Sequence, residues 1–400
     1  MGGLLQQATT RNVCAARTSA PVRILFAVPS MVLGGEARVT LNLLHHIDAE
    51  CFEPHLAVLE QGGAWLRDPP PHVRVHTLGV SRARHAILPF AKLCRRIKPH
   101  VVLSGSAHLN TAVITARPLL PKGTSVLAHE WADITSPHAN CGGPLRLFIY
   151  RNVYKRVDAV ICQSDYMKEK LIREFGLGPT KVLRIYNPVD IDSITALAES
   201  EPRPFPDTGP NLVAVGRFSY EKGFDLLLRC APLIRQAVPT VCLTLVGDGP
   251  DLPILKAAQR DLRLESCVRF VGLRRNPYPF IKHADLLVLP SRNEALPNVV
   301  LEAIALGTPV VATNSMGALS EILSCTRHMR VAKDTTPEAL AAEIISTLAN
   351  VTARPKAGPE PQFEARFGVH AVTREYQRIL WHSIRRNAAN RDVDKFGGSC

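Results

Sequence analysis

The stretch of sequence that decides the fold runs from Ala284 to Leu323 and reads ADLLVLPSRNEALPNVVLEAIALGTPVVATNSMGALSEIL. Its apolar runs LLVLP and PVVAT are continuous rather than alternating, as expected of parallel strands that are covered on both faces. Between them, Asn298 is a favourable N-cap, Pro297 fits only outside or at the start of a helix, and Gly307 suits the left-handed position after one. The stretch therefore predicts two buried strands joined by a loop and a helix that begins near Asn298.

Two acidic residues flank the start of this predicted helix. Glu294 lies in the loop, and Glu302 lies one turn inside the helix. The free N–H groups and positive dipole end of a helix N-terminus favour a diphosphate, and four residues of helix rise about 6 Å, roughly the reach of that group. As isolated residues, both acids could equally be solvated surface groups. Their position after a buried strand, where open α/β sheets bind ligands, favours a nucleotide-sugar site instead.

The same stretch carries a resemblance to a known family. Glu294, seven residues and then Glu302, followed by AIALGTPVVAT and SEIL, resemble the retaining glycosyltransferases of group 1, family 4, which have the GT-B fold. Further matching motifs are VRILFAVPSMVLGGEARVTLNLL, IYNPVD, VAVGRFSYEKGFDLLL and LTLVGDGP, so the resemblance extends from about Val22 to about Leu380. It implies two doubly wound Rossmann-like domains that face each other across a cleft, with a C-terminal helix that crosses back to the first domain.

The rest of the sequence fits an α/β protein with two domains. Strand-like apolar runs alternate with helical patterns in both halves, which predicts a parallel, doubly wound sheet in each. A polar, proline-rich segment, AESEPRPFPDTGPN, predicts a linker. The predicted organisation is a disordered leader at 1–21, an N-terminal acceptor-side domain at 22–197, the linker at 198–211, a C-terminal nucleotide-sugar-binding domain at 212–361, a helix returning to the first domain at 362–386, and a loose tail at 387–400.

The composition is ordinary for a globular enzyme. A length of 400 residues suits two or three domains, and 46% hydrophobic and 21% charged residues are typical of such chains. The ten cysteines are scattered without a Cys-x-x-Cys pair, which favours reduced cysteines in the cytoplasm over disulfides or zinc. No apolar run is long enough to span a membrane, and the N-terminus lacks the apolar core of a secretory signal.

Two cations follow the first predicted strand of the second half. Arg217 and Lys222 lie in GRFSYEKG, which begins with Gly216. By themselves they would more often be surface residues, but the resemblance implies that they hold the donor diphosphate and stabilise it as it leaves. The departure of a diphosphate requires fixed positive charge, which here would replace a metal ion. We therefore expect no metal and no other cofactor, and no histidine or cysteine cluster predicts a metal site.

The first half contributes two further candidates. Gly34 and Gly35 lie between a strand and a helix, where the backbone can approach a phosphate or an acceptor closely. The family usually continues with Ala-Glu-Arg, whereas here Glu36 precedes Ala37. The resemblance implies that His129, in SVLAHEW, bonds a hydroxyl of the donor sugar across the cleft; a structural histidine is the alternative.

Two sets of candidate site residues follow. The candidate catalytic residues are Arg217, Lys222, Glu294 and His129. The candidate donor-binding residues are Gly34, Gly35, Gly216, Ala295, Asn298, Val299 and Glu302. Ala295 and Met316 stand where the family more often has glycine, and Ser320 stands where it more often has proline, but the charged positions are intact.

The chain carries an excess of positive charge, +13 from 48 Lys and Arg against 35 Asp and Glu. Two basic stretches, SRARHAILPFAKLCRRIKPH and GGPLRLFIYRNVYKRVDAV, mix cations with apolar residues in a helical pattern. Such helices can rest on anionic lipid, although core helices with solvated cationic faces are an equal alternative. Nucleic acid is not an expected partner, because no nucleic-acid-binding motif accompanies the charge.

Together these features predict a retaining glycosyltransferase of the hexosyl or N-acetylhexosaminyl type. It would move a sugar from a nucleotide-diphosphate sugar to a lipid-linked glycan, or to a polysaccharide or lipopolysaccharide acceptor. It would act in the cytoplasm, as a peripheral protein on the inner face of the cytoplasmic membrane. Two alternatives stay open: a nucleotide-sugar-binding GT-B protein without turnover, and a nucleotide-sugar epimerase. The intact charged residues argue against the first.

Overall fold

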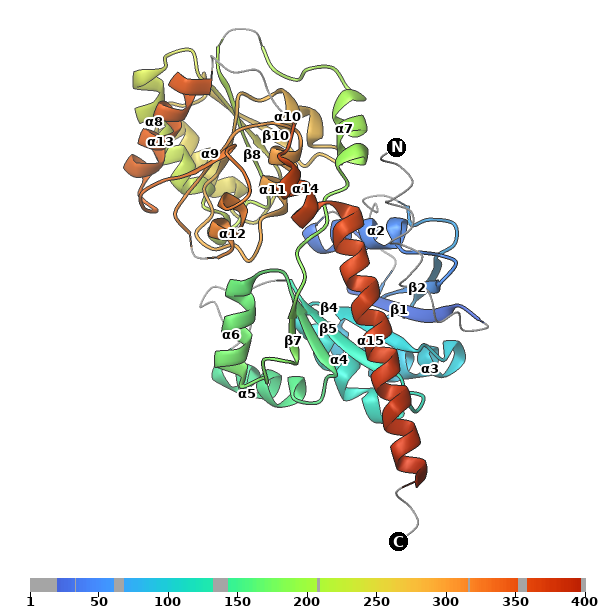
Figure 1. Ribbon diagram of the computed structural model, residues 1–400. Helices are drawn as coiled ribbons and strands as arrows, with labels where there is room; N and C mark the ends of the chain where they lie inside the picture. Colours follow the sequence, from blue (N-terminus) through green and yellow to red (C-terminus); the bar gives the residue numbers. More distant parts are fainter. Residues whose placement is uncertain are drawn as a thin grey trace, which may run out of the picture. The chain divides into compact units, whose positions relative to one another are not determined.

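The computed structural model describes residues 20–32, 34–60, 68–131, 143–206, 209–315, 317–351 and 358–396, without the side chains of 143–147, 351 and 387–396. The predicted leader up to residue 19 and Met316 lie outside the described residues. Contacts divide the chain into two units, Met1–Pro188 with Val369–Cys400, and Val189–Gly368. Each unit contains a parallel sheet whose strands alternate with helices along the chain, so the predicted doubly wound arrangement is confirmed for both (Figure 1).

The first unit contains a seven-stranded sheet. Its strands are β1 (Val22–Val28), β2 (Phe52–Val58), β3 (Arg74–Thr77), β4 (Val101–Gly105), β5 (Ser125–Glu130), β6 (Ala159–Cys162) and β7 (Val182–Arg184). The order across the sheet is β3-β2-β1-β4-β5-β6-β7, and every neighbouring pair is parallel. The order reverses between β1 and β4, which makes this point the expected ligand-binding crevice of the sheet.

Helices connect these strands. They are α2 (Gly35–His46), α3 (Ile87–Ile97), α4 (Ala107–Thr115), α5 (Gly143–Tyr154) and α6 (Asp165–Phe175), with the short 3-10 helices η1 (Ala83–His85) and η2 (Arg117–Leu119). In the core, Ile24 and Phe26 of β1 belong to one buried cluster with Leu41 and Leu44 of α2. All residues of β1 except Arg23 are buried, which explains why its sequence is a continuous apolar run.

The predicted final helix is two helices, α14 (Pro361–Phe367) and α15 (Val369–Phe396), which separate at Gly368. α15 belongs to the first unit, where it contacts α2, β4 and β5, as the predicted return of this helix requires. Val372, Tyr376 and Leu380 give it a buried face in the core of that unit. The helix extends beyond the predicted end at residue 386, since the sequence NAANRDVDKF contains no glycine or proline and the first glycine after it is Gly397.

The second unit contains a six-stranded sheet. Its strands are β8 (Asn211–Val215), β9 (Cys242–Val246), β10 (Val268–Gly272), β11 (Leu286–Leu289), β12 (Val310–Ala312) and β13 (Met329–Val331). Its helices are α7 (Ile191–Glu199), η3 (Tyr220–Lys222), α8 (Phe224–Ala237), α9 (Leu252–Asp261), α10 (Tyr278–His283), α11 (Asn298–Ala305), α12 (Leu319–Leu323), α13 (Pro337–Val351) and α14. The order β10-β9-β8-β11-β12-β13 reverses between β8 and β11, so this sheet has its own crevice there.

The contact-based boundary between the units differs from the predicted linker at 198–211. The division falls between Pro188 and Val189, because α7 packs against α10 and α11 of the second unit. The polar, proline-rich segment therefore follows a helix that already belongs to the second unit. Its composition marks a surface connection inside that unit rather than the crossing itself.

The described cysteines are reduced, as predicted, except at one position. Among the described residues, six cysteines are free: Cys94, Cys162, Cys230, Cys242, Cys267 and Cys325. Cys242 is partly exposed, and the other five are buried. Cys51, just before β2, is disulfide-bonded, so the prediction of reduced cysteines is wrong at that position. Among the described residues, no helix combines the length and the apolar character needed to cross a membrane.

Candidate functional site

The second unit gathers predicted site residues at its crevice. β8 and β11 are adjacent and parallel, so the loops that follow them leave the sheet at the same edge. Gly216, Arg217 and Lys222 follow β8, and Glu294 follows β11. The fold therefore brings together residues that are more than seventy positions apart in the sequence.

One contact joins the two loops directly. The Lys222 ammonium Nζ donates to Oε1 of Glu294 at 2.7 Å, and the Ser291 hydroxyl donates to the same oxygen at 2.8 Å. The Glu294 side chain is 10% exposed and that of Lys222 is 31% exposed, so the pair is partly shielded from water but still reachable. Arg217, nearer to the end of β8, is exposed. The site thus contains one cation that is held by a carboxylate and a second that projects from the surface.

A second ion pair, absent from the sequence prediction, supports the first. Arg292 binds Asp225 with two parallel hydrogen bonds of 2.7 Å, and it also donates to the Tyr220 carbonyl at 2.7 Å. Burial opposes ionisation of Asp225, but the hydrogen bonds and charge of Arg292 outweigh it and lower the pKa of that carboxyl. Because Asp225 follows Lys222 closely and Arg292 precedes Glu294, this clamp fixes the two loops that carry the Lys222–Glu294 contact.

Two glycines pack closely against the backbone of the loop between β11 and α11. Gly223 has φ 65°, and a Cβ there would overlap the carbonyl oxygen of Pro290. Gly317 has φ 139°, and a Cβ there would overlap the carbonyl oxygen of Glu294. Both positions require glycine for conformation and for space. The loop that carries Glu294 is therefore packed against both Gly223 and Gly317. The sequence did not predict these two close contacts.

α11 begins where the sequence predicted but is capped differently. Asn298 is the first helical residue, and the cap position is occupied by Pro297 in an extended conformation, without a side-chain cap. The prediction of Asn298 as N-cap is therefore wrong by one residue. Asn298 and Val299 are partly exposed in the first turn, whereas Ala295 is buried in the preceding loop. The positive end of the helix dipole lies at the same edge of the sheet as Glu294.

Glu302 lies inside the unit rather than on its surface. Its side chain is among the buried polar groups, at 3% exposed, on a helix whose next residues are also buried. The Tyr278 hydroxyl of α10 donates to its Oε1 at 3.5 Å. The structure thus places Glu302 behind the exposed first turn of α11. Its role toward a ribose stays a prediction.

In the first unit, the predicted glycine loop lies at the crevice between β1 and β4. Gly34 and Gly35 are exposed at the start of α2. Gly34 has φ 172°, which any residue adopts, and a Cβ there would meet only the Val32 carbonyl oxygen at 3.8 Å. Neither the backbone nor the packing of the described residues therefore requires glycine at position 34.

Next to this loop lie two acids, the partly buried Glu36 and the buried Glu130. Burial and the nearby charge of Glu130 raise the pKa of Glu36 to about 8, although the indole of Trp131 partly opposes the shift. Burial also raises the pKa of Glu130 to about 7, against hydrogen bonds from Tyr154 and Asn110. Asn110 donates to Glu130 at 2.7 Å, and the Tyr154 hydroxyl donates to the same oxygen. At neutral pH this pair therefore retains at least one proton.

His129 is more deeply buried than its predicted role, a hydrogen bond to a hydroxyl of the donor sugar, suggests. It is 1% exposed, its ring stacks on Trp131 with centroids 3.5 Å apart, and its Nδ1 lies 3.2 Å from the Tyr376 hydroxyl of α15. Burial lowers the pKa of His129 to about 3, so the ring is neutral at physiological pH. Its Nε2 is sealed from solvent and has no hydrogen-bond partner among the described residues.

The described residues contain no group of three His, Cys, Asp or Glu side chains that could hold a metal ion. The polar groups at the second crevice are instead the two cations and the acids described above.

Comparison with known proteins agrees with this geometry. The family model "Glycosyltransferase Family 4" matches residues 33–193, and the model "Glycosyl transferases group 1" matches residues 209–350. The chain belongs to the group 1, family 4 glycosyltransferases. The first match contains the glycine loop and His129, and the second contains Arg217, Lys222, Glu294 and Glu302. The family resemblance inferred from the sequence is therefore confirmed.

Individual relatives are similar at moderate identity. The chain is 28% identical over 290 residues to the lipopolysaccharide core biosynthesis glycosyltransferase LpsE of Rhizobium meliloti, a match that covers 71% of this chain and 77% of LpsE. It is 24% identical over 307 residues to N-acetylgalactosamine-N,N'-diacetylbacillosaminyl-diphospho-undecaprenol 4-alpha-N-acetylgalactosaminyltransferase of Campylobacter jejuni, covering 73% of this chain and 81% of that protein. Among solved structures, Anabaena Alr3699/HepE in complex with UDP and glucose has a TM-score of 0.73 at 19% identity, covering 90% of this chain and all of that chain. This last likeness shows the shared fold.

Proposed function

We propose that this glycosyltransferase takes its sugar from a nucleoside-diphosphate donor and transfers it with retention of anomeric configuration. The observation that carries the proposal is the contact between Lys222 and Glu294 at the crevice of the second unit. It brings a cation, a carboxylate and the positive end of α11 to one edge of the sheet. A sugar diphosphate offers matching chemistry, since its phosphates are anionic and its sugar hydroxyls are hydrogen-bond donors.

The proposed donor site assigns a task to each group. Lys222 and the exposed Arg217 would face the diphosphate and offset the charge that develops as the sugar–phosphate bond breaks. The first turn of α11, with Asn298 and Val299, would meet the phosphates, as helix N-termini do. Glu294 would accept hydrogen bonds from sugar hydroxyls, because its carboxylate is fixed by Lys222 and Ser291. These groups supply positive charge without a metal ion, so we propose turnover in its absence.

The proposed step conserves atoms and protons. The acceptor hydroxyl oxygen forms a bond to the anomeric carbon while the bond from that carbon to the diphosphate breaks. With retention, the acceptor approaches from the side of the leaving diphosphate, which can take the hydroxyl proton. The products are the glycosylated acceptor and a nucleoside diphosphate.

The glycine loop supports an approach by ligand at the first unit. Gly34 adopts an extended conformation with room for a side chain, so the fold does not explain glycine there. A phosphate or an acceptor group that approaches the backbone closely would explain it. His129 would contribute Nε2, which has no hydrogen-bond partner among the described residues, to the same reaction as a hydrogen-bonding group, without titrating near neutral pH.

We propose a lipid-linked glycan or a lipopolysaccharide-type acceptor. LpsE is named for lipopolysaccharide core biosynthesis, and the Campylobacter relative is named for a diphospho-undecaprenol acceptor. Both names support an acceptor anchored in a membrane. The Campylobacter name gives N-acetylgalactosamine and the name of LpsE gives no sugar, so the proposal extends to hexosyl and N-acetylhexosaminyl donors alike.

An anionic membrane surface is the proposed place where such an acceptor is met, at the cytoplasmic face of the membrane. Leu88 in α3 is 71% exposed, and Phe148 and Ile149 in α5 are 63% and 43% exposed. α4 contacts both α3 and α5, so these helices belong to one side of the first unit. Lys92 and Arg151 on the same helices are exposed as well. Apolar residues that enter the headgroup region beside cations are typical of helices that lie on anionic lipid.

A panel of UDP- and GDP-sugars, tested in the presence of a chelator, examines the donor proposal. A donor should raise the melting temperature of the wild-type protein by mass action and should be consumed when an acceptor is added. Lys222→Ala should lose turnover, whereas Lys256→Ala, which removes an exposed cation from α9, should not. The product then decides among the alternatives: a transferred sugar supports the proposal, an epimerised sugar contradicts it, and an inverted anomer contradicts retention.

A further inference from the structure

A pocket of about 460 Å³ lies beside α15, at the edge of the first sheet opposite to the glycine loop. One wall is the α15 segment from Arg378 to Arg386, and the other contains Asp158 and Thr180, which precede β6 and β7. Ser125, at the start of β5, donates to the Ser383 carbonyl at 3.1 Å and ties α15 to this edge. The volume falls in the range of small-ligand sites, roughly 300–1,000 Å³.

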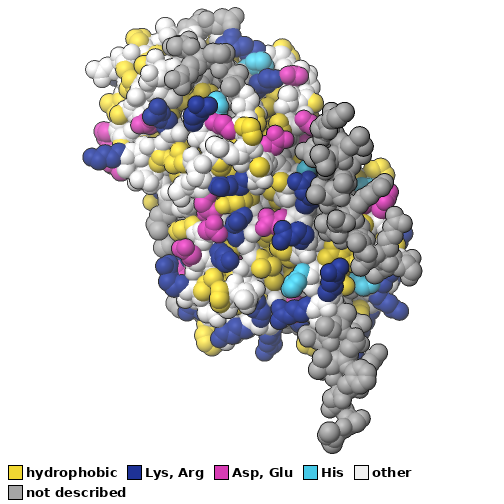
Figure 2. Space-filling view, viewed as in Figure 1, with side chains coloured by type: hydrophobic (Ala, Val, Ile, Leu, Met, Phe, Trp, Pro, Cys, Tyr) yellow, Lys and Arg dark blue, Asp and Glu magenta, His cyan; other side chains and the backbone are white. Residues whose placement is uncertain are grey.

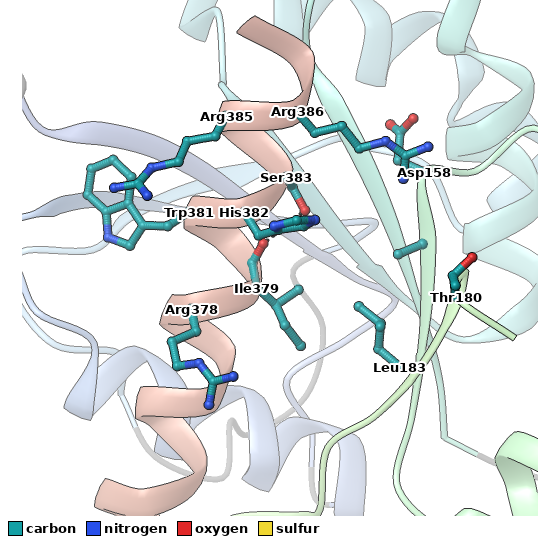
Figure 3. A pocket seen from close by; sticks show the side chains of 11 residues that line it. Asp158, Thr180, Leu183, Arg378, Ile379, Trp381, His382, Ser383, Arg385 and Arg386 are labelled. Carbon is teal, nitrogen blue, oxygen red and sulfur yellow. Dashed lines mark hydrogen bonds between the residues drawn. The ribbon is translucent and has the colours of Figure 1, made fainter. Parts of the chain in front are cut away.

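The lining of this pocket is strongly basic. Arg378, Arg385 and Arg386 line it together with the exposed His382, and all three arginines are exposed. Figure 3 shows Arg386 extending toward Asp158 and Arg385 lying on the side of Trp381. Within the described residues, none of the three arginines forms an ion pair with an acid. The pocket therefore presents three guanidinium groups that no described carboxylate neutralises.

The acid in the wall is already engaged elsewhere. Oδ1 of Asp158 accepts from the Arg117 guanidinium at 2.7 Å, and Oδ2 accepts from the Val126 backbone N–H at 2.8 Å. Arg117 thus offsets the charge of Asp158, and the arginines of α15 remain in excess. Burial lowers the pKa of Lys181, next to Thr180; the charge of Asp158 opposes this shift, and the charges of Arg117 and Arg386 add to it.

Charge is distributed unequally between the two units. The first unit contains 29 of the 48 Lys and Arg residues and 15 of the 35 Asp and Glu residues, whereas the second contains 19 and 20. The whole positive excess of the chain thus belongs to the unit that contains the pocket. Figure 2 shows many lysine and arginine side chains on the face of the molecule that is in view. An anion would be drawn toward this unit before it meets any particular residue.

We propose that this pocket binds a phosphate-bearing group, either the headgroup of an anionic lipid or a soluble phosphate compound. Guanidinium groups match phosphate oxygens through paired hydrogen bonds, and three of them line this pocket. The Trp381 side chain supplies an apolar wall for the glycerol or sugar that carries the phosphate. The pocket is separate from the transfer site, because it lies where β6 and β7 begin, and ligands of the reaction belong at the carboxyl ends of the strands.

The test compares two triple variants that lose the same charge. Arg378→Gln, Arg385→Gln and Arg386→Gln together remove the cations of the pocket and keep side chains that favour a helix. Lys256→Gln, Arg260→Gln and Arg330→Gln together remove three exposed cations of the second unit. All three tryptophans, Trp65, Trp131 and Trp381, fall in the first unit, so melting followed by tryptophan emission reports on that unit.

Two probes separate the two sources of phosphate. Inorganic phosphate at constant ionic strength should raise the melting temperature of the wild type and of the control variant but not of the pocket variant, if the ligand is soluble. Phosphatidylcholine vesicles to which phosphatidic acid has been added should retain the wild type and the control, and the pocket variant should bind at least about tenfold more weakly, if the ligand is a lipid headgroup. Either pattern supports the pocket. Equal responses of the two triple variants to both probes would overturn it, because the effect would then belong to net charge or to another site.

Discussion

Replacing Glu130 with glutamine should flatten the pH dependence of the first unit's stability. Glu130 is 1% exposed, and burial raises its pKa from 4.5 to about 7. A carboxyl whose pKa is higher in the folded than in the unfolded state stabilises the fold while it is protonated. That contribution is fully present below pH 4.5 and is lost as the pH rises through 7. Glutamine keeps an oxygen that can accept from Asn110 and Tyr154, and it does not titrate.

The size of the effect follows from proton linkage. The unfolded carboxyl has lost its proton over most of the range between pH 5 and pH 7, whereas the folded carboxyl keeps it, so stability falls by up to about 1.4 kcal/mol for each pH unit. Partial ionisation of the native group near its own pKa reduces the total to roughly 2 kcal/mol over this range. Glu36 acts in the same direction, and removing the charge of Glu130 also lowers the pKa of Glu36. Both consequences make the Glu130→Gln curve flatter. The lowered pKa of His129 has the opposite effect on the slope, but it is common to both proteins and cancels in the difference.

Urea unfolding followed by tryptophan emission at several pH values between 5 and 8 measures this effect, because all three tryptophans belong to the first unit. Glu169→Gln removes an exposed carboxylate from α6 of the same unit and should leave the slope unchanged. If wild type and Glu130→Gln lose stability in parallel between pH 5 and pH 7, the buried acid does not hold a proton in the folded state and the reasoning fails.

Three further predictions concern the second crevice and the surface. Lys222→Ala should reduce turnover by roughly 10²–10³-fold, the usual loss when one preorganised charge stabiliser is removed; a near-normal rate in a steady-state assay of nucleoside diphosphate release would contradict its role. Gly317→Ala should reduce turnover, because a Cβ would overlap the Glu294 carbonyl oxygen at φ 139°, whereas Gly358→Ala, where no atom of the described residues lies within 4 Å of a Cβ, should be active. The wild type should sediment with vesicles of anionic lipid, and it should sediment less as the salt concentration rises. The double variant Leu88→Ser, Phe148→Ser should bind these vesicles more weakly. Equal sedimentation of the wild type with neutral vesicles would argue against an electrostatic membrane contact.

The fold was predictable where local and tertiary requirements coincide. LLVLP and PVVAT form β11 and β12 because strands buried on both faces need continuous apolar side chains, and Gly307 ends the helix between them at φ 72°. β7 and β13 were not predicted, because each has three residues and its burial is incomplete. So short a segment shows no periodicity, and only pairing with a neighbouring strand makes it part of a sheet.

The site was predictable to the extent that motifs mark strand ends. Lys222 and Glu294 could be assigned to loops that follow strands, but their 2.7 Å contact depends on the adjacency of β8 and β11, which the sequence does not encode locally. The Arg292–Asp225 clamp joins residues sixty-seven positions apart, and each of them has the appearance of an ordinary surface charge in the sequence. Such pairs become visible only when the two loops are placed side by side.

The two crevices resemble each other in topology and differ in electrostatics. Each crevice lies where the strand order reverses, after the first strand of its unit along the chain. Each also contains a glutamate, Glu36 in the first turn of α2 and Glu294 in the loop before α11. In the second unit that acid, Glu294, meets the cation Lys222. In the first unit Glu36 meets a second acid, Glu130, and burial raises the pKa of both toward neutrality. A protonated carboxyl donates a hydrogen bond and an ionised one only accepts, so a change of pH near neutrality alters what the first crevice can offer to an acceptor.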